Sequence, residues 1–422
     1  MRTTLASWLL GVAGTFVVLA LLLLQWQLVL LTLPPLVYLT LAGLRPIQRP
    51  VLDVSRQVSR DRASVGQEVL VTLRVANRGS RLDLVEISDT LPEGLDLKGG
   101  LAHVAISLGA GEEVSIEYKV APNLRGRYVI GPVEARALAA SGLEYEEVTL
   151  SLRSTIVVAP QLEDIRKARI FPRRTRFRIG QIPSRRADLG TEFWGLREYR
   201  PGDETRRINW KASARFDILI TNETEGERSG DAVVIVDART ESLVGPLPRS
   251  TTEHCVRAAL AVASKVLEGR NRVGLMVQRE FLDWVYPAYG RKQLYRILDV
   301  LIRASPGGDW PLEHITWVLE RFFPRNCHVV LVTPILNAET VSLVSDLAAK
   351  AFSVSVVSPS AIEIERGMFA EDMTLDVAYR VASMERQNAI SAMRRFADVV
   401  DWDPGQPLAA ALRGVRPSPR MR

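Results

Sequence analysis

The sequence contains few of the residues from which catalytic centres and cross-linked modules are usually built. Among 422 residues there are only two cysteines and four histidines. This scarcity excludes a disulfide framework and a cysteine-rich zinc or iron–sulfur site, and it leaves little material for a histidine metal site. The chain also lacks a glycine-rich phosphate loop and a Gly-x-Ser-x-Gly nucleophile turn. We therefore expect no catalytic residue.

A cysteine hydrolase is disfavoured by the spacing of the few candidate residues. His254 directly precedes Cys255 in a predicted helix, so their side chains diverge. Cys327 directly precedes His328 in a predicted strand, where neighbouring side chains point to opposite faces. Neither adjacent pair forms a catalytic dyad.

Composition is ordinary for a folded protein, with 47% hydrophobic and 24% charged residues. Such values exclude a disordered chain. The net charge of +6 is modest for this length, and it does not indicate a partner nucleic acid. At about 150 residues per domain, the length predicts two or three folded units.

Two long uncharged runs stand at the N-terminus, Leu5–Leu24 and Leu28–Leu44, with Trp26 between them. Together they are too long for one membrane span, so residues 1–50 are predicted to form a transmembrane helix hairpin. A signal peptide or a buried hairpin is the alternative, but the second run follows the first directly. Arg2 and the arginines from Arg45 onward flank the hairpin. The positive-inside rule then predicts a two-pass cell-membrane protein with cytoplasmic soluble domains.

Residues 51–160 change to a period of two, as in the stretch Val69–Ala76, with turn residues between such stretches. This pattern predicts an immunoglobulin-like β-sandwich of about seven strands, acting as a spacer or a binding module.

Residues 161–230 hold a basic linker, Arg166–Arg186, and then a distinctive stretch, residues 190–215. The linker either touches anionic headgroups, or is solvated, or pairs its arginines with Glu223, Glu225 and Glu227. No aromatic stacking platform accompanies it, which argues against nucleic acid.

The distinctive stretch is dense in arginine and aromatic residues. Pro201-Gly202-Asp203 reads as a turn, and Arg206–Lys211 as a short helix capped by Asp203 or Thr205. Such residues suit contact with an acidic partner, although the arginines can equally pair with local carboxylates and the aromatics can be core. We expect Trp210 to pack between the linker and the following domain. The partner-binding candidates are Arg197, Tyr199, Asp203, Arg206, Trp210 and Arg215.

Residues 231–422 alternate apolar strands, beginning with Ala232–Asp237, and amphipathic helices, beginning with Thr251–Leu267. This alternation predicts a mostly parallel, doubly wound α/β sheet, with Asp237 at the carboxyl end of a strand where ligands bind. The tail after Asp403 reads as a frayed basic end.

The distinctive stretch strongly resembles the signature of the family called domain of unknown function fifty-eight. The resemblance is carried by Leu196-Arg197-Glu198-Tyr199, Gly202-Asp203, Arg206, Ile208, Trp210 and Ser213-Ala214-Arg215. It implies the order membrane hairpin, β-sandwich, signature and von Willebrand factor A-like domain. Members are typically encoded beside MoxR-type AAA+ ATPases, so the resemblance implies a partner of that type and no particular reaction.

In von Willebrand factor A domains the first strand ends in Asp-x-Ser-x-Ser, whose oxygens bind Mg²⁺. This sequence has Asp237, then Arg239 and Glu241 at the two serine positions. A guanidinium opposes a divalent cation, so we expect a degenerate site without metal or cofactor, in which Arg239 pairs with Asp237.

These observations predict a membrane-anchored, non-catalytic interaction or adaptor protein, and the family resemblance implies that its partner is a MoxR-type AAA+ ATPase. The alternative is an Mg²⁺-dependent ligand-binding or hydrolytic protein that uses Asp237 and Asp309.

Overall fold

The chain folds into two compact units, Met1–Gln161 and Leu162–Arg422. The structure is a computed structural model. It describes residues 4–43, 49–139, 141–165, 192–225, 230–324, 327–369 and 373–413.

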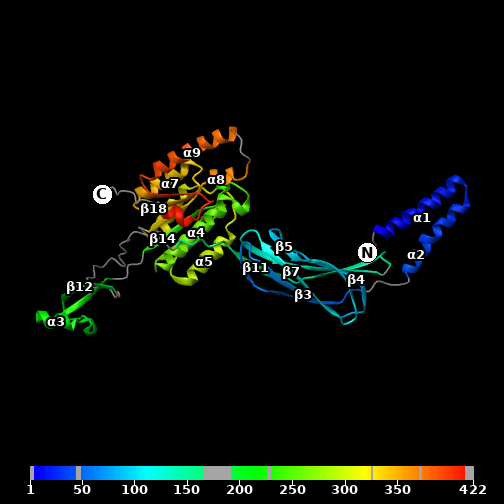
Figure 1. Ribbon diagram of the computed structural model, residues 1–422, viewed down its shortest axis with the longest axis horizontal. Helices are drawn as coiled ribbons and strands as arrows, with labels where there is room; N and C mark the ends of the chain where they lie inside the picture. Colours follow the sequence, from blue (N-terminus) through cyan, green and yellow to red (C-terminus); the bar gives the residue numbers. More distant parts are fainter. Residues whose placement is uncertain are drawn as a thin grey trace. The chain divides into compact units, whose positions relative to one another are not determined.

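The first unit begins with helix α1 (Thr4–Leu23), which is uncharged and 20 residues long. At 1.5 Å per residue it spans about 30 Å, the thickness of a bilayer's hydrocarbon core. It is the one helix among the described residues that is long and apolar enough to cross a membrane. The 3₁₀ helix η1 (Trp26–Thr32) and helix α2 (Leu33–Gly43) continue the apolar segment, and α2 lies beside α1 (Figure 1).

The rest of the first unit is β-structure, as the period-two pattern predicts. Its strands are β1 (Leu52–Val58), β2 (Arg62–Ser64), β3 (Val69–Asn77), β4 (Leu82–Asp89), β5 (Leu95–Gly100), β6 (His103–Leu108), β7 (Glu113–Pro122), β8 (Gly126–Ile130), β9 (Val133–Leu138), β10 (Tyr145–Leu150) and β11 (Ser154–Ala159). They form the sheets β1-β3-β7-β5, β10-β9-β4-β6 and β2-β11-β8. One end of β3 packs with β8 and β11, and its other end packs with β4 and β9.

Between residues 49 and 165 the structure has eleven strands, where the sequence predicted about seven. The reason is that the chain changes sheets without a long turn. At Gly131-Pro132, for example, it leaves β8, which pairs with β11, and enters β9, which pairs with β4 and β10. A buried ion pair between Arg56 and Asp89 lies at this junction, since Arg56 also donates to the carbonyl oxygen of Ile130 at 2.9 Å.

The second unit contains a six-stranded mixed sheet with the order β16-β15-β14-β17-β18-β19. Its strands are β14 (Asp231–Asp237), β15 (Arg272–Gln278), β16 (Leu282–Ala288), β17 (His328–Val332), β18 (Ser353–Pro359) and β19 (Asp398–Trp402). All neighbours are parallel except β16, which runs antiparallel to β15. Strand β14 is buried at every position, which accounts for its continuous apolar sequence.

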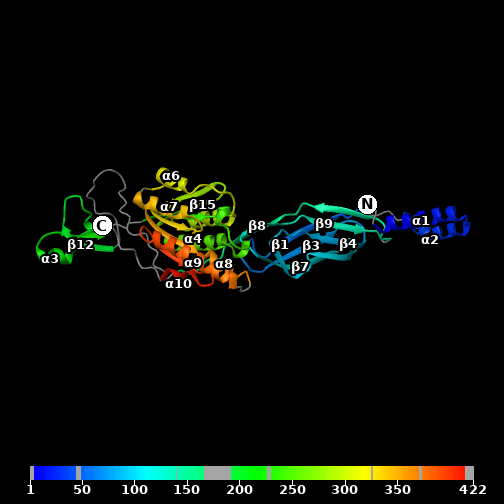
Figure 2. The same cartoon turned by 90° about the horizontal axis from the view of Figure 1, so that it is seen from above.

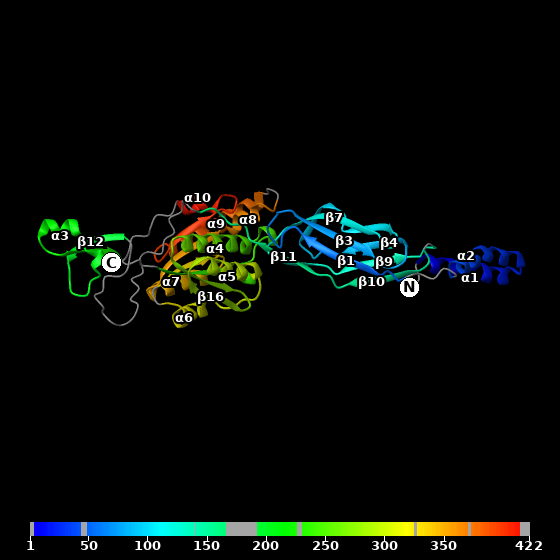
Figure 3. The same ribbon diagram turned by 90° about the horizontal axis from the view of Figure 1, so that it is seen from below.

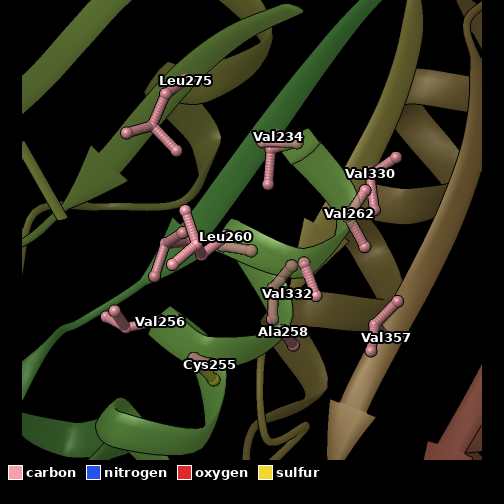
Figure 4. Close-up of a cluster of buried hydrophobic side chains, with 14 of the residues drawn as sticks. Val234, Cys255, Val256, Ala258, Leu260, Val262, Leu275, Val330, Val332 and Val357 are labelled. Carbon is pink, nitrogen blue, oxygen red and sulfur yellow. The ribbon is translucent and has the colours of Figure 1, made fainter. Parts of the chain in front are cut away.

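Helices cover both faces of this sheet. They are α4 (Thr251–Glu268), α5 (Gly290–Arg303), α6 (Glu313–Phe322), α7 (Ala338–Ala349), α8 (Ala361–Arg366), α9 (Met373–Met393) and α10 (Leu408–Arg413). Helices α4, α5 and α10 pack on one face, and α6, α7 and α9 pack on the other. Figure 1 shows α4 and α5 on one side of the strands and α7 and α9 on the other. Figures 2 and 3 show α6 and α10 at opposite edges of the sheet. In Figure 4 the apolar face of α4, including Val256 and Leu260, meets Val234, Leu275 and Val332 of the strands.

The expectation of a frayed end after Asp403 is wrong for residues 408–413, because α10 buries Leu408 and Leu412 in the core that contains α4. Residues 414–422 lie outside the described residues.

A small lobe precedes the six-stranded sheet. It consists of the antiparallel pair β12 (Glu192–Glu198) and β13 (Ile220–Glu225), the 3₁₀ turn η2 (Thr205–Arg207) and helix α3 (Trp210–Phe216). The predicted helix Arg206–Lys211 is wrong in register. Ile208 has extended backbone and bridges Thr221 of β13, so the helix starts only at Trp210 and is capped by Asn209 instead of Asp203 or Thr205. The linker Arg166–Arg186 and Glu227 lie outside the described residues.

Candidate functional site

The carboxyl end of β14 carries Asp237, which is 1% exposed. Its carboxylate accepts hydrogen bonds from the hydroxyls of Ser242 at 2.8 Å and Thr333 at 2.9 Å. The Arg239 guanidinium also binds both carboxylate oxygens, with Nε 3.0 Å from Oδ1 and Nη2 3.2 Å from Oδ2. Ser242 lies in the turn η3 (Thr240–Ser242), and Thr333 follows β17, so three separate segments meet at this carboxylate.

Arg239 is itself enclosed, with a side chain that is 3% exposed. Its Nη1 contacts the carboxylate of Glu241 and lies 3.5 Å from that of Glu339, at the start of α7. These two glutamates are 36% and 60% exposed, so they form the outer side of the cluster. Asp309 accepts a bond from the backbone N–H of Glu241 at 3.3 Å. The ion pair expected between Arg239 and Asp237 is therefore present.

The chemistry of this cluster follows from the hydrogen bonds that the two carboxylate oxygens of Asp237 already accept. A carboxylate has about four lone-pair directions, and hydroxyl and guanidinium donors already fill those of Asp237. The guanidinium supplies the positive charge that a carboxylate buried at a strand end requires. Among the residues that the structure describes, no group of three or more His, Cys, Asp or Glu side chains is arranged to hold a metal ion.

Two potential nucleophiles lie in the core of this unit. Burial, and then the charge of Asp237, raise the pKa of the Cys255 thiol well above its usual value. Burial likewise raises the pKa of Cys327 to about 12. Burial, and then the charge of Arg257, lower the pKa of His254 to about 4, and its ring meets that of Trp402 edge-on. Both cysteines are thus neutral, buried thiols at neutral pH and are poor nucleophiles.

In the lobe, Arg197 and Asp203 form a bidentate ion pair with both N–O distances at 2.8 Å. The backbone N–H of Arg200 donates to the same carboxylate at 2.9 Å. The hydrogen bond from Arg197, and then that from Arg200, lower the pKa of Asp203 to about 2. Arg206 likewise pairs with Glu204 at 2.6 Å. Arg197, Asp203 and Arg206 therefore order the turn between β12 and α3, and the backbone N–H of Tyr199 bonds to Leu219 of the opposing segment.

Trp210 differs from these paired residues, because its side chain is 67% exposed to solvent. The linker half of its expected packing lies outside the described residues. Within the described residues the helix buries Ser213 against β13, with the Ser213 hydroxyl 2.9 Å from the Ile220 backbone nitrogen. Lys211 and Arg215 are one helical turn apart and are exposed.

Sequence reasoning missed three further exposed apolar residues of the lobe, Phe216, Ile218 and Leu219. They lie on either side of Asp217, whose positive φ of 57° ends α3. The sequence signal that could have indicated this exposed surface was three large apolar residues close together at a helix end. Around Asp237, the sequence did not indicate the contacts of Ser242, Thr333 or Glu339.

Residues 195–387 match the family described as "Protein of unknown function DUF58". The uncharacterized protein YeaD of Bacillus subtilis (strain 168) is 25% identical over 226 residues, which cover 50% of this chain and 54% of YeaD. The match thus spans about half the length of that relative.

Solved structures give only distant likenesses. A non-cellulosomal cohesin from Archaeoglobus fulgidus is 14% identical with a TM-score of 0.19, covering 25% of this chain and 91% of the cohesin. A CARDB domain from Pyrococcus furiosus, in complex with di-metal ions, is 18% identical with a TM-score of 0.18, covering 27% and 97%. TM-scores this low carry no argument about fold or function.

Proposed function

Because residues 195–387 belong to the DUF58 family, whose function is unknown, we propose a function from the chemistry of the chain itself. The protein is a membrane-anchored, non-catalytic interaction protein, and the lobe of β12, α3 and β13 is its partner-binding element.

The observation that carries the proposal is the exposure of large apolar side chains on the lobe. Trp210 and Phe216 are 67% and 61% exposed, and Ile218 and Leu219 are 47% and 46% exposed. Lys211 and Arg215 are also exposed, and on α3 they are sequence neighbours of Trp210 and Phe216. Exposed aromatic and aliphatic side chains together with basic ones have the composition of a binding hot spot for a partner that carries acidic residues.

The ion pairs of the lobe support the same reading. Arg197 and Asp203 fix the turn that leads into α3, so the exposed residues are held before a partner arrives. Preorganisation lowers the entropy that binding must overcome. Arg197 and Arg206 are therefore positioning residues, and contact with the partner falls to Trp210, Lys211 and Arg215.

The anchor in this proposal is α1, and the shorter apolar segment Trp26–Ala42 completes a two-pass hairpin. Arginines on both flanks then keep the soluble units in the cytoplasm. Reporter fusions after Leu44 and at Arg422 should both give a cytoplasmic signal, and an external signal at either point would overturn the hairpin.

We further propose that the six-stranded sheet belongs to a von Willebrand factor A-like domain whose cation is replaced by Arg239. This is supported by the guanidinium on both oxygens of Asp237. The residues present do not fit a divalent cation, because binding one would require displacing Arg239 from three carboxylates. The Mg²⁺-dependent alternative predicts a heat of Mg²⁺ binding that Asp237→Ala abolishes. Our proposal predicts no such heat for the full chain in detergent.

The partner that we propose is an AAA+ ATPase of the MoxR type, an expectation that rests on the family resemblance. The test is affinity purification of the full chain from native membranes, followed by mass spectrometry. Trp210→Ala should reduce recovery of the partner by at least about thirtyfold, the equivalent of a hot-spot loss of about 2 kcal/mol. Trp317→Ala is the matched control, because Trp317 is a 59% exposed tryptophan on α6. Equal recovery with the two variants would refute the assignment of the lobe.

A further inference from the structure

Helix α9 presents an apolar face to solvent on the side opposite to its packing. It is 21 residues long, and its inward side chains Arg386, Ile390 and Met393 are buried. Its outward side chains Val377, Val381 and Met384 are 58%, 52% and 68% exposed. Isolated exposed apolar residues are common, but three on successive turns of one helix form a stripe.

The stripe has the spacing of a coiled-coil seam. Val377, Val381, Met384 and Asn388 are separated by four, three and four residues, which are the steps between successive d and a positions of a heptad. Asn388 is exposed and falls at an a position. A polar asparagine at one a position is a known means of fixing the register and the number of helices in a coiled coil.

The flanking charges select the partner and its direction. Arg380 falls at a g position and Glu385 at the e position five residues later, and both are exposed. In a parallel pair of identical helices, each g position faces the e position of the next heptad, so Arg380 would face Glu385 of the other copy. In an antiparallel pair g faces g and e faces e, which would bring like charges together. Within one copy, Arg380 lies 2.9 Å from Asp376, in an exposed pair that does not remove it from the surface.

We propose that α9 is a self-association surface, on which a second copy of this chain packs its own α9 in parallel through Val377, Val381, Met384 and Asn388. The seam is about two heptads long and offers only three apolar side chains from each copy, so the pair buries little apolar area. The pair is therefore weak and depends on the local concentration of the chain. This inference is independent of the function proposed for the lobe.

The test is chemical cross-linking of the full chain in its membrane. Both native cysteines are buried, at 0% and 1% exposure, so Met384→Cys introduces the reactive thiol. A short bismaleimide should give a covalent dimer through position 384. Lys292→Cys is the control, because it places an exposed thiol on α5, on the opposite face of the sheet. No dimer with Met384→Cys, or equal yields from the two variants, would overturn the proposal.

Direction is tested with two differently tagged copies, one carrying Val377→Cys and the other Asn388→Cys. A parallel pair separates these positions by eleven residues, about 16 Å along the helix. Each tagged copy should therefore cross-link to its own kind and not to the other. Efficient cross-linking between the two tags would indicate an antiparallel pair and would overturn the parallel arrangement.

Charge reversal gives a readout that a merely structural role would not produce. Arg380→Glu or Glu385→Arg, each in the Met384→Cys background, should lower the dimer yield about fivefold by replacing attraction with repulsion at two symmetry-related pairs. The double reversal should restore the yield. If the double variant stays as low as the single variants, Arg380 and Glu385 do not face each other and the proposal fails.

Discussion

Arg239–Asp237 at the sheet end and Arg197–Asp203 in the lobe are the same ion pair in two environments. The first has side chains that are 3% and 1% exposed, and the second 24% and 19%. In the first, burial makes the guanidinium indispensable, because a lone carboxylate there would have no compensating charge. In the second, solvent screens the charges, and the pair mainly fixes a turn. At the carboxyl end of the sheet, where α/β proteins usually bind ligands, Arg239 thus occupies the carboxylate of Asp237. The lobe instead exposes apolar side chains to solvent.

Burial alone does not determine what surrounds an ion pair. The pair Arg56–Asp89 in the β-unit is 0% exposed at both residues, and Tyr118 donates to Asp89 at 2.6 Å. The other contacts of Arg56 are backbone carbonyls and a serine, so the pair joins neighbouring sheets of the β-unit. The sheet-end pair differs because half-exposed Glu241 and exposed Glu339 surround the same guanidinium.

The largest effect that we expect is from removal of the buried guanidinium. Arg239→Ala should lower the free energy of unfolding of the α/β unit by about 3–5 kcal/mol, because Asp237 would stay buried without its partner. Hydrogen exchange at the amides of β14 and β17 in the full chain measures this locally. Arg279→Ala is the control, since it removes a surface pair with Asp283 and should cost about 1 kcal/mol or less. Equal losses of stability in the two variants would contradict the difference that we infer between the buried and the exposed ion pair.

A pair of tryptophans sharpens the same comparison. Trp402 is 0% exposed in the core beneath α4, and Trp402→Ala should cost about 3–5 kcal/mol. Trp210→Ala should change stability by no more than about 0.5 kcal/mol, as for other surface substitutions. Thermal melting of the two variants side by side measures both. A large loss of stability for Trp210→Ala would instead make that residue part of a core.

The smallest effect concerns protonation of Asp203. Its folded pKa, about 2, lies below the ordinary value of 3.8, so its contribution to stability is present above pH 4 and is lost as the pH falls through about 2. A carboxyl-resolved NMR titration should show this value move up toward 3.8 in Arg197→Met. Arg206→Met should leave it nearly unchanged, because Arg206 bonds to Glu204. An unchanged pKa of Asp203 in Arg197→Met would mean that the pair of Arg197 and Asp203 does not form in solution.

The regular elements of the α/β unit follow from local sequence. The predicted strand Ala232–Asp237 is β14 to within one residue, and the predicted helix Thr251–Leu267 is α4 to within one residue. Continuous apolar strands and amphipathic helices can be predicted from local sequence, because the pattern of apolar residues reflects which faces of each element are buried. The Arg239–Asp237 pair was also predicted, but from the resemblance to von Willebrand factor A domains, in which Arg239 takes a serine position of the metal-binding motif.

Features set by distant contacts were not predictable. The helix of the lobe was misplaced because Ile208 pairs with Thr221, which lies beyond α3 in the sequence. The partner of Arg56 is 33 residues away, and Glu339 is 100 residues from Arg239. The exposure of Trp210 depends on how α3 packs on the strand pair β12 and β13. No local sequence pattern separates an exposed tryptophan from a buried one.

The central claim, that the lobe and not the sheet end meets the partner, is tested most directly by site-specific photo-cross-linking in native membranes. A photoreactive amino acid replaces Trp210 in one variant and Glu339, the exposed outer residue of the sheet-end cluster, in the other. The account predicts a covalent adduct with a single partner from position 210 and none from position 339. An adduct from position 339 alone would contradict it and would return the binding site to the carboxyl end of the sheet.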